Sequence, residues 1–94
     1  MRTRQTPDFD AASIPAGLLR SHTLGADTWG RIVVLEGRLL YTIESPVPRQ
    51  QELDPDHPGI VEPEVPHRVE ARGSVRFRVE FYRRAAAPGE GSRP

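Results

Sequence analysis

The sequence predicts an all-β domain, and three features of the chain support that prediction. Its 10 prolines and 8 glycines divide the 94 residues into short segments, none of which is long enough to carry the apolar repeat of a helix. Turn-forming residues recur roughly every 8–12 positions, which is typical of a β-sandwich or barrel. The last apolar segment alternates with a period of two, as a strand with one buried face does. Its inward positions are Val75, Phe77, Val79 and Phe81, and its outward positions are Arg76, Arg78, Glu80 and Tyr82.

We expect three regions along the chain. Residues 1–13 are polar and are predicted to form an N-terminal arm, whereas residues 14–83 carry the β domain. Residues 84–94 are small, polar and rich in Gly and Pro, which predicts a flexible tail. The domain is expected to open with a strand over residues 18–23, just after Pro15.

The first predicted hairpin lies in the middle of the chain. Residues 28–36 include the β-branched apolar run that begins at Ile32, so they are expected to form a buried strand. Gly37 is expected to turn this strand into a second one over residues 38–44. Residues 45–52 are predicted to form a loop, because the two prolines in this segment cannot donate to a central ladder.

The last third of the chain repeats this organisation. Residues 60–62 are predicted to form a short strand, which Pro63 ends. A second hairpin is expected from residues 67–71 into residues 75–83, with its turn at Arg72-Gly73.

Length and composition limit the function classes. A chain of 94 residues is one domain with room for one core and one pocket. The 13 arginines balance the 13 acidic residues, so nucleic acid and anionic membranes are disfavoured as partners. The absence of cysteine excludes disulfides, thiolate ligands and a cysteine nucleophile. Because no signal-peptide pattern or membrane-length apolar run occurs, a cytoplasmic protein is expected.

Several motifs, taken together and in order, resemble a small cupin-like bacterial family, the TehB/YeaR-like proteins of tellurite resistance. The motifs are Pro15–His22 (PAGLLRSH), Thr28–Arg31 (TWGR), Leu35–Leu39 (LEGRL), His57–Pro63 (HPGIVEP), Pro66–Glu70 (PHRVE) and Val75–Arg83 (VRFRVEFYR). The resemblance implies a single-domain jelly roll, or double-stranded β-helix, of two packed antiparallel sheets with a pocket between them. It also implies a methyltransferase domain in TehB proteins, and this chain is too short to hold one.

The same resemblance implies a site for one divalent metal. His22 lies near the histidine pair of the first cupin motif, and His67 stands where the second motif places its histidine. The position of the usual glutamate ligand is occupied by Gly30. Glu62 is the carboxylate expected to complete the set, with Glu80 in reserve, and zinc, iron or nickel would accept such ligands.

Each of these ligands has a structural alternative. His67 alternates with apolar positions and so faces inward, where it is either a ligand or a hydrogen-bonded core residue. His22 is either a site residue or a surface residue at a strand end, and Glu62 points into the pocket or lies at the rim. Glu80 is expected to face outward and to pair with an arginine, Arg68 or Arg76. His57 is assigned to turn chemistry.

Two further residues are predicted to line the substrate pocket. Trp29 is either a core anchor or a pocket wall, and the adjacent Gly30 would let a ligand approach the backbone closely. Arg31 could hold an anionic substrate by a bidentate contact, but with 13 arginines in the chain a place on a solvated face is the favoured interpretation.

The predicted function is a small cupin-like module that binds a small molecule or oxyanion, with a divalent metal, and is linked by the resemblance to tellurite or oxidative-stress resistance. One alternative is a metal-dependent oxygenase or isomerase. The other is a non-catalytic regulatory or scaffolding protein. A homodimer is expected, because a small jelly roll exposes sheet edges that pairing would cover.

Overall fold

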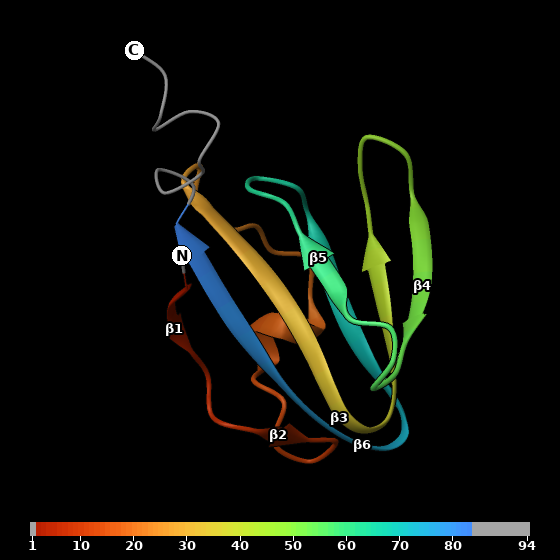
Figure 1. The fold of residues 1–94 in the computed structure, drawn as a ribbon. Coiled ribbons are helices and arrows are strands. Elements are labelled where there is room, and N and C mark those ends of the chain that lie inside the picture. The colour runs from red at the N-terminus through yellow and green to blue at the C-terminus, as the bar shows by residue number, and fades with distance from the viewer. Residues whose placement is uncertain (1, 84–94) are drawn as a thin grey trace.

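The computed structural model describes residues 2–83 and confirms the all-β fold class (Figure 1). The elements in order are β1 (Arg2–Gln5), β2 (Phe9–Asp10), the 3₁₀ turn η1 (Ala16–Leu19), β3 (Thr28–Ile43), β4 (Arg49–Leu53), β5 (Gly59–Val61) and β6 (His67–Arg83). The predicted C-terminal tail, residues 84–94, lies outside the described residues.

Two long antiparallel strands, β3 and β6, form the centre of the fold and turn at the same end of the molecule (Figure 1). Thr28 pairs with Arg83 at one end of this ribbon, and Ile43 pairs with His67 at the other. Near the middle, the pairing register shifts and Gly37 and Gly73 adopt φ angles of 79° and 81°. The ribbon therefore bends into a first arm (residues 28–36 with 75–83) and a second arm (residues 39–43 with 67–71).

The two hairpins predicted at Gly37 and at Arg72-Gly73 are wrong. Each glycine bends a continuous strand, and the paired residues of the two strands lie 24–55 positions apart in the sequence. A positive φ serves a tight turn and a strand bend equally well. Local sequence therefore cannot distinguish the two.

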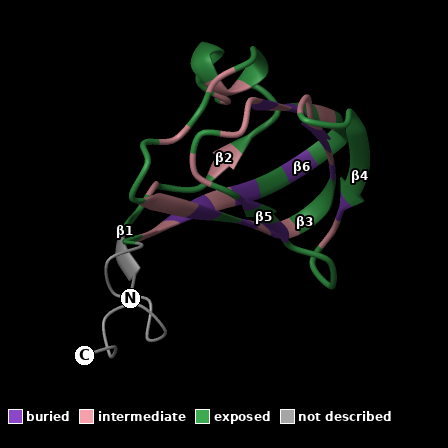
Figure 2. Cartoon of the chain, turned by 90° about the horizontal axis from the view of Figure 1, so that it is seen from above, coloured by how far each residue is buried: buried purple, intermediate pink, exposed green. Residues whose placement is uncertain are grey.

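The two arms are the two layers of the jelly roll. β5 extends the first arm by pairing Val61 with Gly30, and β4 extends the second by pairing Leu53 with Leu39. Buried residues follow β3 and β6 along their inner faces (Figure 2). Together with their neighbours on β4 and β5 they form one core: Ile32, Val34, Leu39, Tyr41, Leu53, Val61, Val69, Val75, Phe77 and Val79.

The segment predicted as a polar arm contributes two strands to the first arm. β1 pairs with β6 from Arg2 opposite Tyr82, and β2 places Phe9 opposite Phe77. Between these strands, the Thr6 amide donates to the Val79 carbonyl at 2.9 Å, and the Val79 amide donates to the Thr6 hydroxyl at 3.0 Å. Residues 2–10 are therefore bound to the sheet.

Two other local predictions are wrong. The expected strand over residues 18–23 is replaced by η1, which begins after Pro15 and is closed by a hydrogen bond from the Leu18 amide to the Pro15 carbonyl at 2.9 Å. Proline suits the first turn of a helical segment because its φ is already set. The expected loop over residues 45–52 ends early, since β4 begins at Arg49, directly after Pro48.

Candidate functional site

Two histidines that lie far apart in the sequence meet at the open end of the second arm. The amide of each donates to the carbonyl of the other at 3.0 Å, so His22 and His67 form an isolated antiparallel bridge. Residues that face each other across such a bridge present their side chains on the same side. The two imidazole centroids are accordingly 4.0 Å apart, with the rings inclined at 57°.

Backbone carbonyls fix the tautomer of both histidines. Nδ1 of His22 lies 3.0 Å from the Arg20 carbonyl oxygen, and Nδ1 of His67 lies 2.9 Å from that of Val65. A carbonyl only accepts hydrogen bonds, so in the neutral form of each ring Nδ1 carries the proton and Nε2 is the acceptor. Among the described residues, no side chain or backbone group hydrogen-bonds to either Nε2. The site therefore presents two free acceptors.

The surroundings of His67 favour its uncharged form. Only 3% of the residue is exposed, and this burial lowers the pKa of its imidazole, with His22 acting in the same direction; the Val65 carbonyl and Glu44 oppose the shift. Its ring also meets Tyr41 edge-on, at a centroid distance of 5.9 Å.

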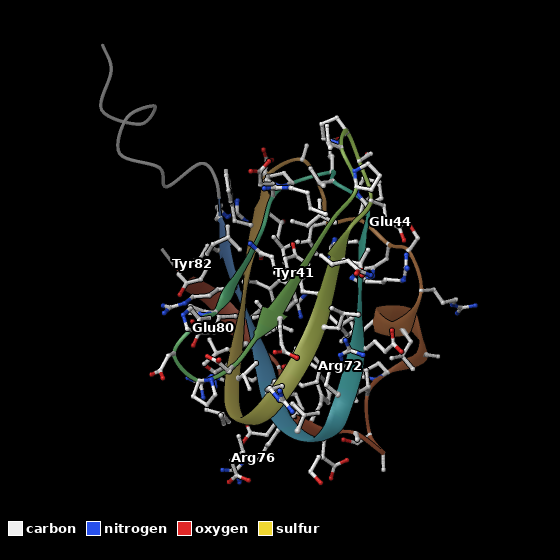
Figure 3. The ribbon with its side chains drawn as sticks, turned by 90° about the vertical axis from the view of Figure 1, so that its right-hand side faces the viewer. Tyr41, Glu44, Arg72, Arg76, Glu80 and Tyr82 are labelled. Atoms are coloured by element: carbon white, nitrogen blue, oxygen red, sulfur yellow. The ribbon has the colours of Figure 1, made fainter. Side chains whose placement is uncertain are left out.

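Tyr41 supports the histidines from the inner face of β3 and was not predicted as a site residue. It lies in the middle of the molecule (Figure 3), where its hydroxyl donates to the Ile60 carbonyl at 2.9 Å and links the two arms. Burial raises the pKa of Tyr41 to about 12, and Glu62 acts in the same direction. The alternation of apolar residues in 39–43 could have identified Tyr41 as an inward residue.

The histidines border a cavity of ≈ 240 Å³ between the two arms. Apart from the histidines and Arg4, every residue that lines it is apolar: Leu18, Leu24, Ile32, Val61, Val69, Phe77, Val79 and Phe81. The Arg4 guanidinium lies 4.3 Å from the centroid of the Phe81 ring. The cavity can therefore accept a mainly apolar molecule that carries a few polar groups.

The other predicted ligand, Glu62, lies elsewhere. Val61 lines the histidine cavity, whereas Glu62, the next residue, is exposed and borders a separate cavity of ≈ 230 Å³ with Tyr41 and Arg49. In the part of the chain that the structure describes, no three His, Asp or Glu side chains form a group that could hold a metal ion. His22 and His67 can thus supply two ligands, and the remaining ones would have to come from water or a bound molecule.

Trp29 and Arg31 lie on the outer face of the first arm. They border a shallow depression together with Ile60 and Tyr82, away from the histidines. They alternate with Gly30, which faces the interior, and this alternation of the strand explains their position. Sequence reasoning therefore grouped residues that the structure places on two faces of one sheet.

Two further predictions concern residues outside the site. Glu80 lies on the outer face of β6 as expected, but only 6% of the residue is exposed. The Tyr82 hydroxyl donates to its carboxylate at 2.8 Å (Figure 3), and the Arg78 guanidinium donates to it at 3.1 Å. The predicted partners pair elsewhere, Arg68 with Glu44 and Arg76 with Glu36. His57 contacts the Asp54 carboxylate at 2.8 Å within its turn, which confirms the turn assignment.

Among residues 2–83, no helix is long and apolar enough to span a membrane.

Comparison with solved structures identifies the fold. TehB from Haemophilus influenzae shares 27% identity and a TM-score of 0.81 over 88% of this chain, which corresponds to 31% of that chain. A protein from E. coli strain K12 shares 22% identity and a TM-score of 0.78, covering 86% of this chain and 87% of that one. FeII HppE shares 20% identity and a TM-score of 0.60, with coverages of 80% and 40%. The fold is thus the predicted cupin-like jelly roll, and the chain spans less than a third of TehB.

No curated protein matches the chain. The model of the TehB-like domain family matches residues 4–79, which include every strand from β2 to β5 and most of β6. The chain therefore belongs to the TehB-like domain family.

Proposed function

We propose that this domain is a binding module that holds a small molecule in the histidine cavity through hydrogen bonds to Nε2 of His22 and His67. The observation that carries the proposal is the pair of Nδ1 contacts to the Arg20 and Val65 carbonyls. These contacts leave two acceptors of defined direction beside an apolar cavity. No buried side-chain nitrogen or oxygen among the described residues lacks a partner, so solvent reaches both Nε2 atoms. A ligand donor therefore replaces water there, with a net gain of about 0.5–1.5 kcal/mol for each hydrogen bond.

Phenol tests this proposal, since it combines an apolar ring with one hydroxyl donor. We expect phenol to bind the native domain and His67→Phe to weaken the binding about tenfold, because one hydrogen bond contributes about 1–1.5 kcal/mol. Isothermal titration calorimetry measures both. The matched control is His57→Phe, which alters an exposed turn histidine outside the cavity. Equal phenol affinities in the two variants would refute the proposal.

A divalent metal held by the same pair is a second candidate. Metal-binding histidines usually donate their other ring nitrogen to a carbonyl or carboxylate, as both histidines do here. FeII HppE shares the fold and supports this candidate by analogy. Zinc should then bind with one ion per chain in a calorimetric titration, and His22→Gln and His67→Gln should each remove the binding. Unchanged zinc affinity in both variants would exclude the pair as ligands.

The corresponding cellular proposal is a role in resistance to tellurite or oxidative stress, supported by membership of the TehB-like family. A host that lacks its own copy of the gene should grow better on tellurite when it expresses the native chain than when it expresses His67→Phe. Equal growth of the two strains on tellurite would count against this role for the domain.

A further inference from the structure

The polar groups of the histidine cavity are not spread around its wall. His22 and His67 lie at the end of the second arm, while Arg4 projects from β1, which pairs with β6 beside Phe81 at the end of the first arm. The two arms diverge from the bend at Gly37 and Gly73. All three polar side chains therefore lie towards the open ends of the arms, and apolar residues such as Phe77 and Val69 line the interior.

Arg4 provides a cationic group without a charged partner among the described residues. Its contact there is with the face of Phe81, and the residue is exposed. A guanidinium that rests on an aromatic ring keeps its N–H donors available for a carboxylate. The cavity thus offers one site for an anion, at Arg4. It also offers two acceptors for hydroxyl donors, one at Nε2 of each histidine.

The size of the cavity limits the body of the ligand. An apolar cavity of about 150 Å³ accommodates benzene, and the volume here is ≈ 240 Å³. One ring with two small polar substituents therefore fits the space.

A shallower depression adjoins this cavity. It is lined by Thr6, Phe9, Pro15 and Gly17, and it shares Leu18, His22, Val79 and Phe81 with the cavity. Phe9 belongs to β2, Gly17 and Leu18 to η1, and Val79 and Phe81 to β6. His22 lines both the depression and the cavity.

From this arrangement we infer that the ligand class is a hydroxylated aromatic monocarboxylate, whose hydroxyl donates to the histidine pair and whose carboxylate pairs with Arg4. This inference rests on the proposed function and specifies the substrate of the same site. It assigns to Arg4 the binding of the carboxylate and to the apolar walls the contact with the ring.

The test compares four probes on the native domain by calorimetry: 3-hydroxybenzoate, 4-hydroxybenzoate, benzoate and phenol. We expect the better-fitting hydroxybenzoate to bind at least tenfold more tightly than either phenol, which lacks the carboxylate, or benzoate, which lacks the hydroxyl. Arg4→Gln should reduce its affinity to that of phenol and leave phenol binding unchanged. Arg72→Gln, which removes an exposed arginine beside the bend, should change neither affinity.

The outcomes separate this inference from the proposed function. If phenol binds and neither hydroxybenzoate binds more tightly, or if Arg4→Gln leaves the hydroxybenzoate affinity unchanged, the carboxylate assignment is wrong and the binding module stands. If none of the four probes binds the native domain, both are overturned. Even if a variant folds poorly, the comparison of the four probes on the native protein tests whether the ligand needs both a carboxylate and a hydroxyl.

Discussion

Replacing Gly37 by alanine is expected to reduce the free energy of unfolding by about 2–5 kcal/mol, from backbone strain of about 1–2 kcal/mol and steric crowding of about 1–3 kcal/mol. Gly37 has a φ of 79°, and an added Cβ would lie 2.0 Å from the Ser74 carbonyl oxygen. That oxygen belongs to the backbone of the paired strand, so it cannot move without distorting the ribbon. Urea denaturation measures the loss.

Gly73 is the matched control for this substitution. It has nearly the same φ, 81°, but nothing lies within 4 Å of an added Cβ. Gly73→Ala should therefore cost only the strain of about 1–2 kcal/mol. Equal losses in the two variants would show that the close contact at Gly37 is not what shapes the bend.

Truncation of Phe77 is expected to produce the other large effect. The residue is completely buried, meets Phe9 edge-on at a centroid distance of 5.7 Å, and forms part of the cavity wall. Phe77→Ala should destabilise the domain by about 3–5 kcal/mol, because it removes the ring and leaves the space unfilled. Thermal and urea unfolding both report this loss.

Phe81→Ala is the comparison for this prediction. Phe81 lies four positions further along the same face, but it is only partly buried and contacts Arg4 at the cavity mouth. Its truncation should cost less than half as much and should weaken the binding of hydroxybenzoates. A larger loss at Phe81 than at Phe77 would contradict the position of the core.

The fold was predictable where the alternation of apolar and polar residues lies within one strand. The alternation from Val75 to Phe81 correctly predicted a buried face, and it also placed Glu80 on the outer face. The strand partners were not predictable, since β3 and β6 pair over 14 positions that are far apart in the sequence. For this reason Gly37 and Gly73 were interpreted as hairpin turns.

The site was predictable only in part, for a similar reason. The family resemblance selected His22 and His67, and the bridge between them brings their rings together. Arg4 was missed, because its position depends on the pairing of β1 with β6. Glu62 was grouped with the histidines although Val61 takes the inward position of that strand. A contact that depends on long-range pairing leaves no periodic signal in the sequence.

We infer that His22 and His67 are Nδ1-protonated rings whose Nε2 atoms accept hydrogen bonds from a ligand. The most direct measurement is a ¹⁵N-detected NMR spectrum of the histidine ring nitrogens at neutral pH, recorded with and without phenol. We predict that both rings show a protonated Nδ1 and an unprotonated Nε2, and that phenol shifts the Nε2 resonances of His22 or His67 while those of His57 stay fixed. Protonated Nε2 atoms in both cavity histidines, or Nε2 resonances that phenol leaves unchanged, would contradict the account.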